Sequence, residues 1–367
     1  MTTDVDYIKA CLSYIDPSLP RSDWVNVGMA LQFELGDNVG YQVFKEWSQQ
    51  SSEFNARQFE ATWKSFKQGF ASFKMGTIVH YAKQGGFDPR SINIKPQERS
   101  EAERARLESE RRKFDEMRRL EAREKAEAAR EIATKRWSRS PAPDTANIHP
   151  YLLKKQCPHP AGPVKQYKNF LQIPAFNKEG TLTTLLSIND TGFKSIIKDS
   201  ILSGSSMTIG KKGADLDKPV LLCEGWATGQ SLYAASKQIT EEGLQVVVAF
   251  NSNNMLHVAK NIRERYPDRP ILICADNDCC NQQNAGLKAA EATQKAIGDN
   301  IGIIYPEFPQ ELIQEKLLAE ESVPTDFNDA HCLYDLDQVA AYIRTGVLEL
   351  EAVRDLKDER NIDMEPN

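Results

Sequence analysis

The chain opens with apolar and aromatic residues at helical spacing. Within the first ninety residues, Phe44 and Trp47 stand three positions apart and Phe59 and Trp63 stand four apart, which places each pair on one face of a helix. This rhythm predicts a small all-helical domain over residues 1–90. The aromatic residues predict a packed core, with a surface that stacks nucleic-acid bases as the alternative.

In the last third of the chain the pattern changes to short apolar runs separated by amphipathic segments. Strands that alternate with helices are typical of a parallel sheet, because consecutive parallel strands need a crossover connection. The pattern therefore predicts a Rossmann-like α/β core with a four-stranded parallel sheet and helices on both faces. The expected strands are 220–223, 245–249, 270–275 and 301–305, and the expected helices are 227–237, 254–266 and 284–297.

A highly charged segment connects the two regions. Residues 98–136 are built from Glu, Arg, Lys and Ala, contain no Gly or Pro, and lack a continuous apolar seam. Opposite charges at three- and four-residue spacing support a single solvated helix. We expect a helical linker over residues 91–143 that acts as a stiff spacer, with self-association as the alternative.

The remaining boundaries follow from turn signals and composition. Apolar runs at 170–176 and 182–188, separated by turn residues, predict an antiparallel β segment within a mixed α/β region over residues 144–215. The parallel-sheet domain is expected at 216–346, where a helix over 336–345 ends it. An acidic, frayed tail is expected at 347–367.

Composition narrows the class of protein. Of the 367 residues, 27% are charged, and no apolar run approaches the roughly 20 residues that span a bilayer. The N-terminus also lacks the basic and then apolar plan of a secretory signal. Seven cysteines without a C-x-x-C pair argue against a zinc ribbon and suit a reducing cytosol. A cytoplasmic, membrane-free protein is expected, and its net charge of −6 leaves nucleic-acid binding to local basic patches.

Three carboxylates follow directly on the apolar runs of two expected strands. Glu224 ends the first run, and Asp276 and Asp278 end the third. Carboxyl ends of parallel strands meet at one edge, where such folds bind ligands. Each close pair of acids would repel by about 4 kcal/mol at an effective dielectric of about 20. A divalent cation removes that repulsion, so the pattern predicts a Mg²⁺ or Mn²⁺ site that handles phosphates. Asp326 is either a further metal ligand or a helix cap.

Four lysines give the mixed region a basic side. We expect them to contact phosphates or a template strand, with simple solvent exposure as the alternative; they are Lys194, Lys198, Lys211 and Lys212. The segment that contains the last two, Gly204 to Lys212, has the wrong spacing and ending for a P-loop.

The acidic segments also resemble a known family. Leu-Leu-Cys-Glu224-Gly225-Trp-Ala-Thr228 and Ala-Asp276-Asn-Asp278 resemble the two signature motifs of the Toprim domain, which bacterial-type primases, type IA and II topoisomerases and some nucleases share. The resemblance is closest to the primases of plasmids and phages. It implies that Glu224 is a general acid or base or a metal ligand, and that Asp276 and Asp278 hold Mg²⁺.

The helical domain resembles a second family, primase C-terminal domain type 2 (PriCT-2). The resemblance covers about residues 5–87 and implies template binding or partner docking. Its residues are Asp23-Trp24-Val-Asn-Val-Gly28-Met-Ala-Leu31, Phe44-Lys-Glu-Trp47-Ser48, Trp63-Lys64-Ser65-Phe66 and Thr77-Ile-Val-His80-Tyr81-Ala82.

These features together predict a DNA primase of a mobile element in a bacterial host. It would make short primers on single-stranded DNA from nucleoside triphosphates, with a separate replicative helicase as a candidate partner. Two alternatives stay open: a metal-dependent nuclease that uses the same carboxylates, and a non-catalytic adaptor that binds nucleic acid in replication or defence.

Overall fold

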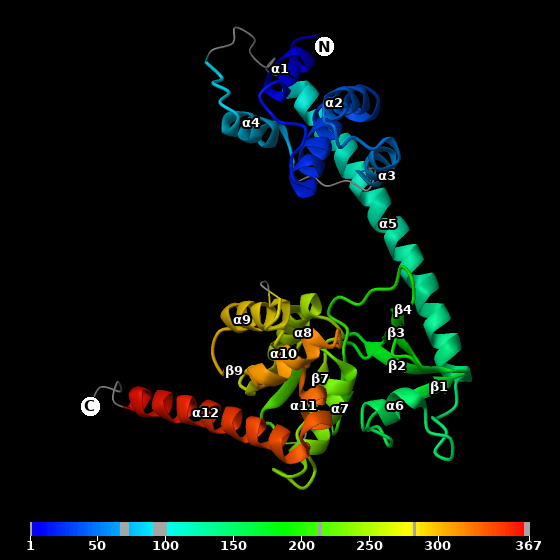
Figure 1. The fold of residues 1–367 in the computed structure, drawn as a ribbon, viewed down its shortest axis with the longest axis vertical. Helices are drawn as coiled ribbons and strands as arrows, with labels where there is room; N and C mark the ends of the chain where they lie inside the picture. Colours follow the sequence, from blue (N-terminus) through cyan, green and yellow to red (C-terminus); the bar gives the residue numbers. More distant parts are fainter. Residues whose placement is uncertain (1, 67–72, 91–100, 212–214, 282–283, 363–367) are drawn as a thin grey trace. The chain divides into compact units, whose positions relative to one another are not determined.

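The computed structural model describes residues 2–66, 73–90, 101–211, 215–281 and 284–362 (Figure 1). Its contacts divide the chain into two compact units, Met1–Lys113 and Phe114–Asn367, which are described separately below. Within the described ranges, no helix is both long and apolar enough to cross a membrane.

The first unit is helical and is built around aromatic side chains. Phe44 is fully buried, and the centroids of five neighbouring aromatic rings lie between 4.7 and 6.1 Å from its own. Gly28 makes this packing possible, because a Cβ there would lie 2.6 Å from the Phe44 ring. The prediction of a packed aromatic core is confirmed. The helices are α1 (Thr2–Leu12), α2 (Arg21–Ser48, interrupted at Gly36), α3 (Ala56–Phe66) and α4 (Met75–Gln84).

The charged segment is one long helix, α5 (Glu101–Arg139), as expected. Its C-terminal part is not fully solvated: Ala129 and Ala133 are buried, whereas most of their described neighbours on α5 are exposed. Lys165 fixes this end, since its Nζ donates to the Trp137 carbonyl (2.7 Å) and lies 4.7 Å from the Trp137 ring centroid. The expectation of a solvated spacer is therefore wrong for the last turns of α5, which pack within the second unit.

An antiparallel sheet follows a short helix, α6 (Pro150–Lys154). Its strands lie in sequence order, and each pairs with the next, which confirms the predicted antiparallel segment. The last strand is exposed along its whole length. The strands are β1 (Lys165–Tyr167), β2 (Phe170–Phe176), β3 (Leu182–Asn189) and β4 (Lys194–Ile196).

The larger sheet has five strands in the order β5-β7-β6-β8-β9. Four of them run parallel, and β5 pairs with β7 in the antiparallel direction at one edge. The expected sheet had four strands; the three residues of β5 are too few to show a hydrophobic pattern. The strands are β5 (Met207–Ile209), β6 (Val220–Cys223), β7 (Val246–Val248), β8 (Ile271–Cys274) and β9 (Ile301–Ile304).

Helices cover both faces of this sheet, because successive strand residues point to opposite sides. In β6, Leu221 and Cys223 join the core beneath α7, α11 and α12, whereas Val220 and Leu222 join the core beneath α8 and α9. Figure 1 shows these helices around the strands. Their bounds are α7 (Trp226–Ser236), α8 (Ser252–Arg265), α9 (Ala285–Ile297), α10 (Gln310–Leu318), α11 (Phe327–Leu333) and α12 (Leu336–Ile362).

The acidic tail differs from the expectation. Helix α12 does not end near residue 345 but continues to Ile362. Leu350 explains the first turns of this extension, because its buried side chain packs where Gly302 of β9 leaves room, 3.2 Å from the position of a Cβ there. The prediction of a frayed tail from residue 347 is wrong as far as Ile362.

Candidate catalytic site at the carboxyl edge of the parallel sheet

Two adjacent parallel strands bring the predicted acids to one edge. Cys223, the last residue of β6, is the register partner of Cys274, the last residue of β8. Glu224 follows Cys223 at once, and Asp276 comes two residues after Cys274. Because neighbouring strands lie about 4.8 Å apart, both acids leave the sheet at the same end and next to each other.

The loop that carries the two aspartates is held in place by its backbone. The Asn277 N–H donates to the Thr325 carbonyl (2.8 Å), and the Asp278 N–H donates to Oδ1 of Asn284 (3.1 Å). Helix α9 packs directly on this loop at Gly286, where a Cβ would lie 2.5 Å from the Asp276 carbonyl oxygen. Any larger residue at Gly286 would push the loop away, so the glycine positions Asp276.

The acids share one electrostatic field. Burial raises the pKa of Asp276 well above its ordinary value, and the charges of Asp326, Glu224 and Asp278 raise it further. Burial and the charges of Asp278 and Asp326 likewise raise the pKa of Glu224. The Lys194 ammonium opposes both shifts. The charges of the four acids therefore act on one another, with one lysine as partial compensation.

Asp326 is a helix cap in the structure. One of its carboxylate oxygens, Oδ1, accepts from the N–H groups of Asn328 (2.7 Å) and Asp329 (2.9 Å) at the start of α11. Asp329 in turn accepts from the Thr325 N–H (2.9 Å) and pairs with Lys155 (3.3 Å). The capping alternative is thus observed, and the second oxygen of Asp326 remains as the atom through which it would reach a metal.

Several buried polar atoms at this edge have no hydrogen-bond partner among the described residues. Oδ1 of Asp276 is one, and the hydroxyl of Tyr151, the indole N–H of Trp226 and the hydroxyl of Thr228 are others. The Tyr151 and Trp226 rings stack with centroids 6.4 Å apart. Sequence reasoning did not single out these aromatic side chains as site residues. Their signal in the sequence was weak: Trp226 lies two residues after Glu224 within the acidic motif, and Tyr151 lies far from that motif in the chain.

The predicted lysines separate into distinct groups. Lys194 begins the exposed strand β4 and acts on Glu224 and Asp276, as described above. Lys198 is exposed two residues beyond that strand. Lys211 lies beyond the end of β5, which runs opposite to β7, and it approaches Glu242 (3.9 Å) just before β7 begins. It therefore lies at the amino end of the parallel strands, away from the acids. Lys212 lies outside the described residues.

The donor set suits a hard divalent cation. Within the described residues, no group of three or more His, Cys, Asp or Glu side chains has the arrangement of a ready-made metal cage. Mg²⁺ does not need such a cage, because it keeps several waters and binds through one or two carboxylates together with substrate phosphates. The partnerless Oδ1 of Asp276 is the kind of atom that would ligate it. The residues therefore fit Mg²⁺ or Mn²⁺.

Comparison with known families identifies the helical domain. Residues 8–82 match the family model of primase C terminal 2 (PriCT-2). The first unit thus contains a PriCT-2 domain, as the sequence motifs indicated.

Two curated relatives are DNA primases named TraC from Escherichia coli. One is 33% identical over 165 residues, which cover 43% of this chain and 11% of the relative. The other is 32% identical over 165 residues, which cover 43% of this chain and 15% of that relative. The chain therefore spans only a small part of the length of these primases.

Solved structures with partial similarity include two primases. The primase fragment of the bacteriophage T7 primase-helicase protein is 13% identical, with a TM-score of 0.35 over 56% of this chain and 74% of that one. A DNA primase domain from Pseudomonas aeruginosa is 14% identical, with a TM-score of 0.32 over 50% of this chain and 52% of that one. These scores are too low to establish a shared fold.

Proposed function

We propose that this chain is a DNA primase whose catalytic domain is of the Toprim type and occupies about residues 216–346. The observation that carries the proposal is the set of acids at the carboxyl ends of β6 and β8, with a partnerless oxygen on Asp276. The similarity to the TraC primases supports the same reaction. The product would be a short primer on single-stranded DNA, made from nucleoside triphosphates.

Each acid has a role in this proposal. Asp276 and Asp278 would hold Mg²⁺ or Mn²⁺, with Glu224 and Asp326 able to complete the set. When bound, the ion would neutralise charge on the phosphate oxygens during nucleotidyl transfer. Glu224 would accept a proton from the attacking hydroxyl or donate one. Its raised pKa lies closer to neutral pH than that of an ordinary glutamate, and a general acid or base is most effective when its pKa is near the working pH.

The residues around the acids would position the nucleotide and the template DNA strand. Lys194, whose charge reaches the acids, would contact a phosphate of the nucleotide or template, and Lys198 would extend this contact along the exposed side of β4. Lys211 would contact nucleic acid away from the acids, at the amino end of the parallel strands. The proposed phosphate contact of Lys212 stays a prediction from the sequence, because this lysine lies outside the described residues. The PriCT-2 domain (residues 1–90) would bind template or a partner such as a replicative helicase. The predicted linker at 91–143 would connect it to the catalytic domain, with the last turns of α5 packed within the second unit. A mobile element in the bacterial cytoplasm would be the setting.

Incubation of the full chain with Mg²⁺, single-stranded DNA and labelled nucleoside triphosphates tests this function. We expect oligonucleotide extension products, and we expect the double variant Asp276→Asn, Asp278→Asn to lose at least about a hundredfold in rate. Asp217→Asn, at an exposed aspartate outside the site, is the matched control and should retain activity. Cut template without extension would replace the primase with a nuclease. Neither product from the folded protein would sink both.

A further inference from the structure

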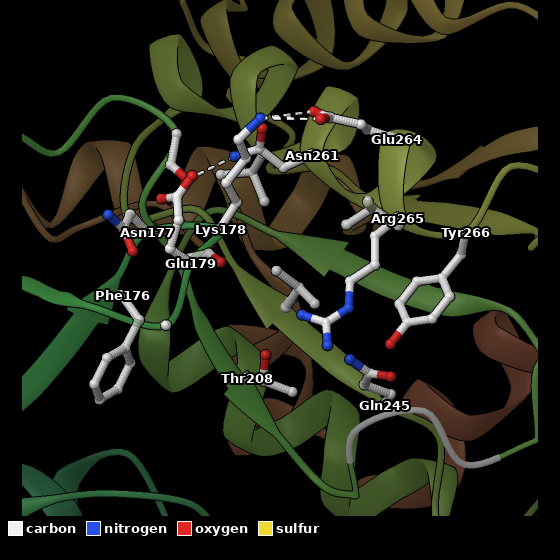
Figure 2. Close-up of a pocket in the computed structure, with 16 residues that line it drawn as sticks. Phe176, Asn177, Lys178, Glu179, Thr208, Gln245, Asn261, Glu264, Arg265 and Tyr266 are labelled. Atoms are coloured by element: carbon white, nitrogen blue, oxygen red, sulfur yellow. Dashed lines mark hydrogen bonds and ion pairs between the residues drawn. The ribbon is translucent and has the colours of Figure 1, made fainter.

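A groove of about 700 Å³ runs along the α8 side of the larger sheet, and none of the four acids lines it. It exists because β5 extends the sheet beyond the cover of α8. Thr208 of β5 is the register partner of Val247 of β7, so both point to the same face. Helix α8 covers Val247 but leaves Thr208 half-buried. Figure 2 shows Thr208 at the groove.

The floor of the groove is aliphatic and its wall is held firmly. Val247, Val258 and Ile262 are buried and supply the floor. One wall of the groove is formed at Gly204, whose backbone N–H and carbonyl groups both form hydrogen bonds to side chains of α8. The Gly204 N–H donates to Oδ1 of Asn254 (2.7 Å), and the Gly204 carbonyl accepts from Nδ2 of Asn261 (2.8 Å). A wall fixed in this way gives a preformed site.

The polar atoms of the groove form a specific set. Nδ2 of Asn261 donates to the Gly204 carbonyl, which leaves Oδ1 of Asn261 as an acceptor with no partner among the described residues. The Thr208 hydroxyl, which also lines the groove, has no partner among them either. Arg265 reaches over the floor beside Tyr266, with its guanidinium 5.6 Å from that ring centroid (Figure 2). The described contacts include no carboxylate paired with Arg265.

Arg265 has no carboxylate partner among the described contacts, so its guanidinium can donate to an anion even though one further acid, Glu179, lines the same groove. Lys178, from the turn between β2 and β3, pairs with Glu264 of α8 across the rim (3.0 Å), and these two charges cancel. The hydrogen bond and charge of Glu264 raise the pKa of Lys178, and the charge of Glu179, the neighbour of Lys178 in the same turn, adds to this shift, so Glu179 also acts at this end of the rim. Arg265 is the next residue along α8, and it points over the floor.

We propose that this groove binds a nucleotide. The planar base would lie on the aliphatic floor, and an exocyclic amine or ring N–H would donate to Oδ1 of Asn261. The phosphate would accept from the Arg265 guanidinium, whose fork of donors matches phosphate oxygens. The volume lies within the roughly 300–1,000 Å³ of small-molecule sites. The ligand is either a free mononucleotide or the terminal nucleotide of a strand.

Titration calorimetry of the full chain in EDTA tests this site with adenosine monophosphate as the probe. We expect a Kd below about 1 mM. Arg265→Gln should weaken adenosine monophosphate about tenfold and leave adenosine unchanged, because only the phosphate contact is lost. Arg354→Gln, at an exposed arginine outside the groove, is the matched control and should change nothing.

A second pair of variants tests the floor. Thr208→Phe keeps a residue that favours strands but fills the groove, so it should abolish binding, whereas Thr208→Val keeps the volume and should weaken binding less than about fivefold. Circular dichroism and the thermal midpoint show whether Thr208→Phe folds. If it does not, the surface variant Arg265→Gln still decides.

The remaining arms separate the outcomes. The Asp276→Asn, Asp278→Asn variant should bind adenosine monophosphate normally, which distinguishes this groove from the acidic edge. Tighter binding of 5′-phosphorylated pentadeoxyadenylate than of adenosine monophosphate would support a strand end, and the reverse would support a free nucleotide. Equal affinity for inorganic phosphate and adenosine monophosphate, or no effect of Arg265→Gln, would overturn the proposal, as would a Kd above about 1 mM.

Discussion

The aromatic core of the first unit and the acidic edge of the second both bury polar atoms, but they treat them in opposite ways. In the first, the Trp24 indole donates to the Ser48 hydroxyl (2.9 Å) and the Trp47 indole donates to the Ile15 carbonyl (3.0 Å). In the second, the Trp226 indole and Oδ1 of Asp276 have no partner among the described residues.

This difference distinguishes a structural cluster from a reactive one. A buried polar atom without a hydrogen bond costs about 1–3 kcal/mol, so most are paired in folded proteins. In a site that binds a substrate or an ion, some buried polar atoms form hydrogen bonds or ligand contacts only when the ligand is present. The free protein is less stable as a result. Four partnerless polar atoms at one end of a sheet, next to interacting acids, are therefore a stronger indication of function than the aromatic residues of the first unit.

The largest effect is expected in the aromatic core. Phe44→Ala removes a fully buried ring from among five others, so it should destabilise the first unit by about 3–5 kcal/mol. Chemical denaturation followed by near-ultraviolet circular dichroism measures this. Phe193→Ala, at a phenylalanine that is 65% exposed, should change the free energy of unfolding by less than about 0.5 kcal/mol. Equal effects of the two substitutions would show that the core is not packed as described.

The acidic edge should respond in the opposite direction. Asp276→Asn replaces a carboxyl whose charged form is disfavoured by burial and by the neighbouring acids, so it should stabilise the second unit by roughly 1–2 kcal/mol while it removes primer synthesis. Thermal unfolding in EDTA measures the gain without a contribution from bound metal. Asp217→Asn should leave the midpoint unchanged. A clear loss of stability in Asp276→Asn would mean that the carboxylate is structural, and the contrast between the two regions would fail.

A matched pair of hydroxyl deletions sharpens the contrast. Ser48→Ala takes the partner from the Trp24 indole and should cost about 1 kcal/mol. Thr228→Val replaces a buried hydroxyl that has no described partner by a methyl group of similar size, so it should be neutral or slightly stabilising. Urea denaturation of the two variants compares them directly. If Thr228→Val costs as much as Ser48→Ala, the Thr228 hydroxyl has a partner in solution.

The acidic edge could be predicted because its logic is local. Glu224 and Asp276 each follow an apolar run of strand length, and parallel strands end at a common edge. The two acids therefore come together whenever their strands lie side by side in the sheet. Lys211 shows where this reasoning stops. It was grouped with Lys194 by its position in the sequence, but the short antiparallel strand β5 carries it to the opposite end of the sheet.

The groove could not be predicted in this way. Its lining comes from the β2–β3 turn, β5, β7 and α8, which only tertiary packing brings together. No spacing between Thr208, Asn261 and Arg265 carries a signal of its own. Asp326 is a third kind of case, because its motif allowed both a cap and a metal ligand, and only the hydrogen bonds at α11 show the cap.

The smallest expected effect concerns His331. This residue belongs to the second unit, but its ring has a hydrogen-bond partner, as the buried indoles of the first unit do. Its Nδ1 lies 3.0 Å from the Ser231 hydroxyl, which also accepts from the Asn328 side chain (3.0 Å), and burial lowers the pKa of this histidine below 6.5. The folded state therefore favours the neutral ring, whereas the unfolded chain takes up a proton as the pH falls through 6.5.

The stability that His331 contributes should consequently be complete above pH 6.5 and decline as the pH falls through 6.5 toward the lower folded pKa. Because the ring is partly exposed and Asp335 opposes the shift, the change should stay below about 1 kcal/mol. Urea denaturation of the wild-type chain and His331→Gln at pH 8 and pH 5 measures it as a difference, so that other titrating groups cancel. The opposite result would be a wild-type chain that is more stable relative to the variant at pH 5 than at pH 8. It would show that His331 is charged in the folded state, and the contact between its ring and the Ser231 hydroxyl would then not indicate a structural role for a neutral ring.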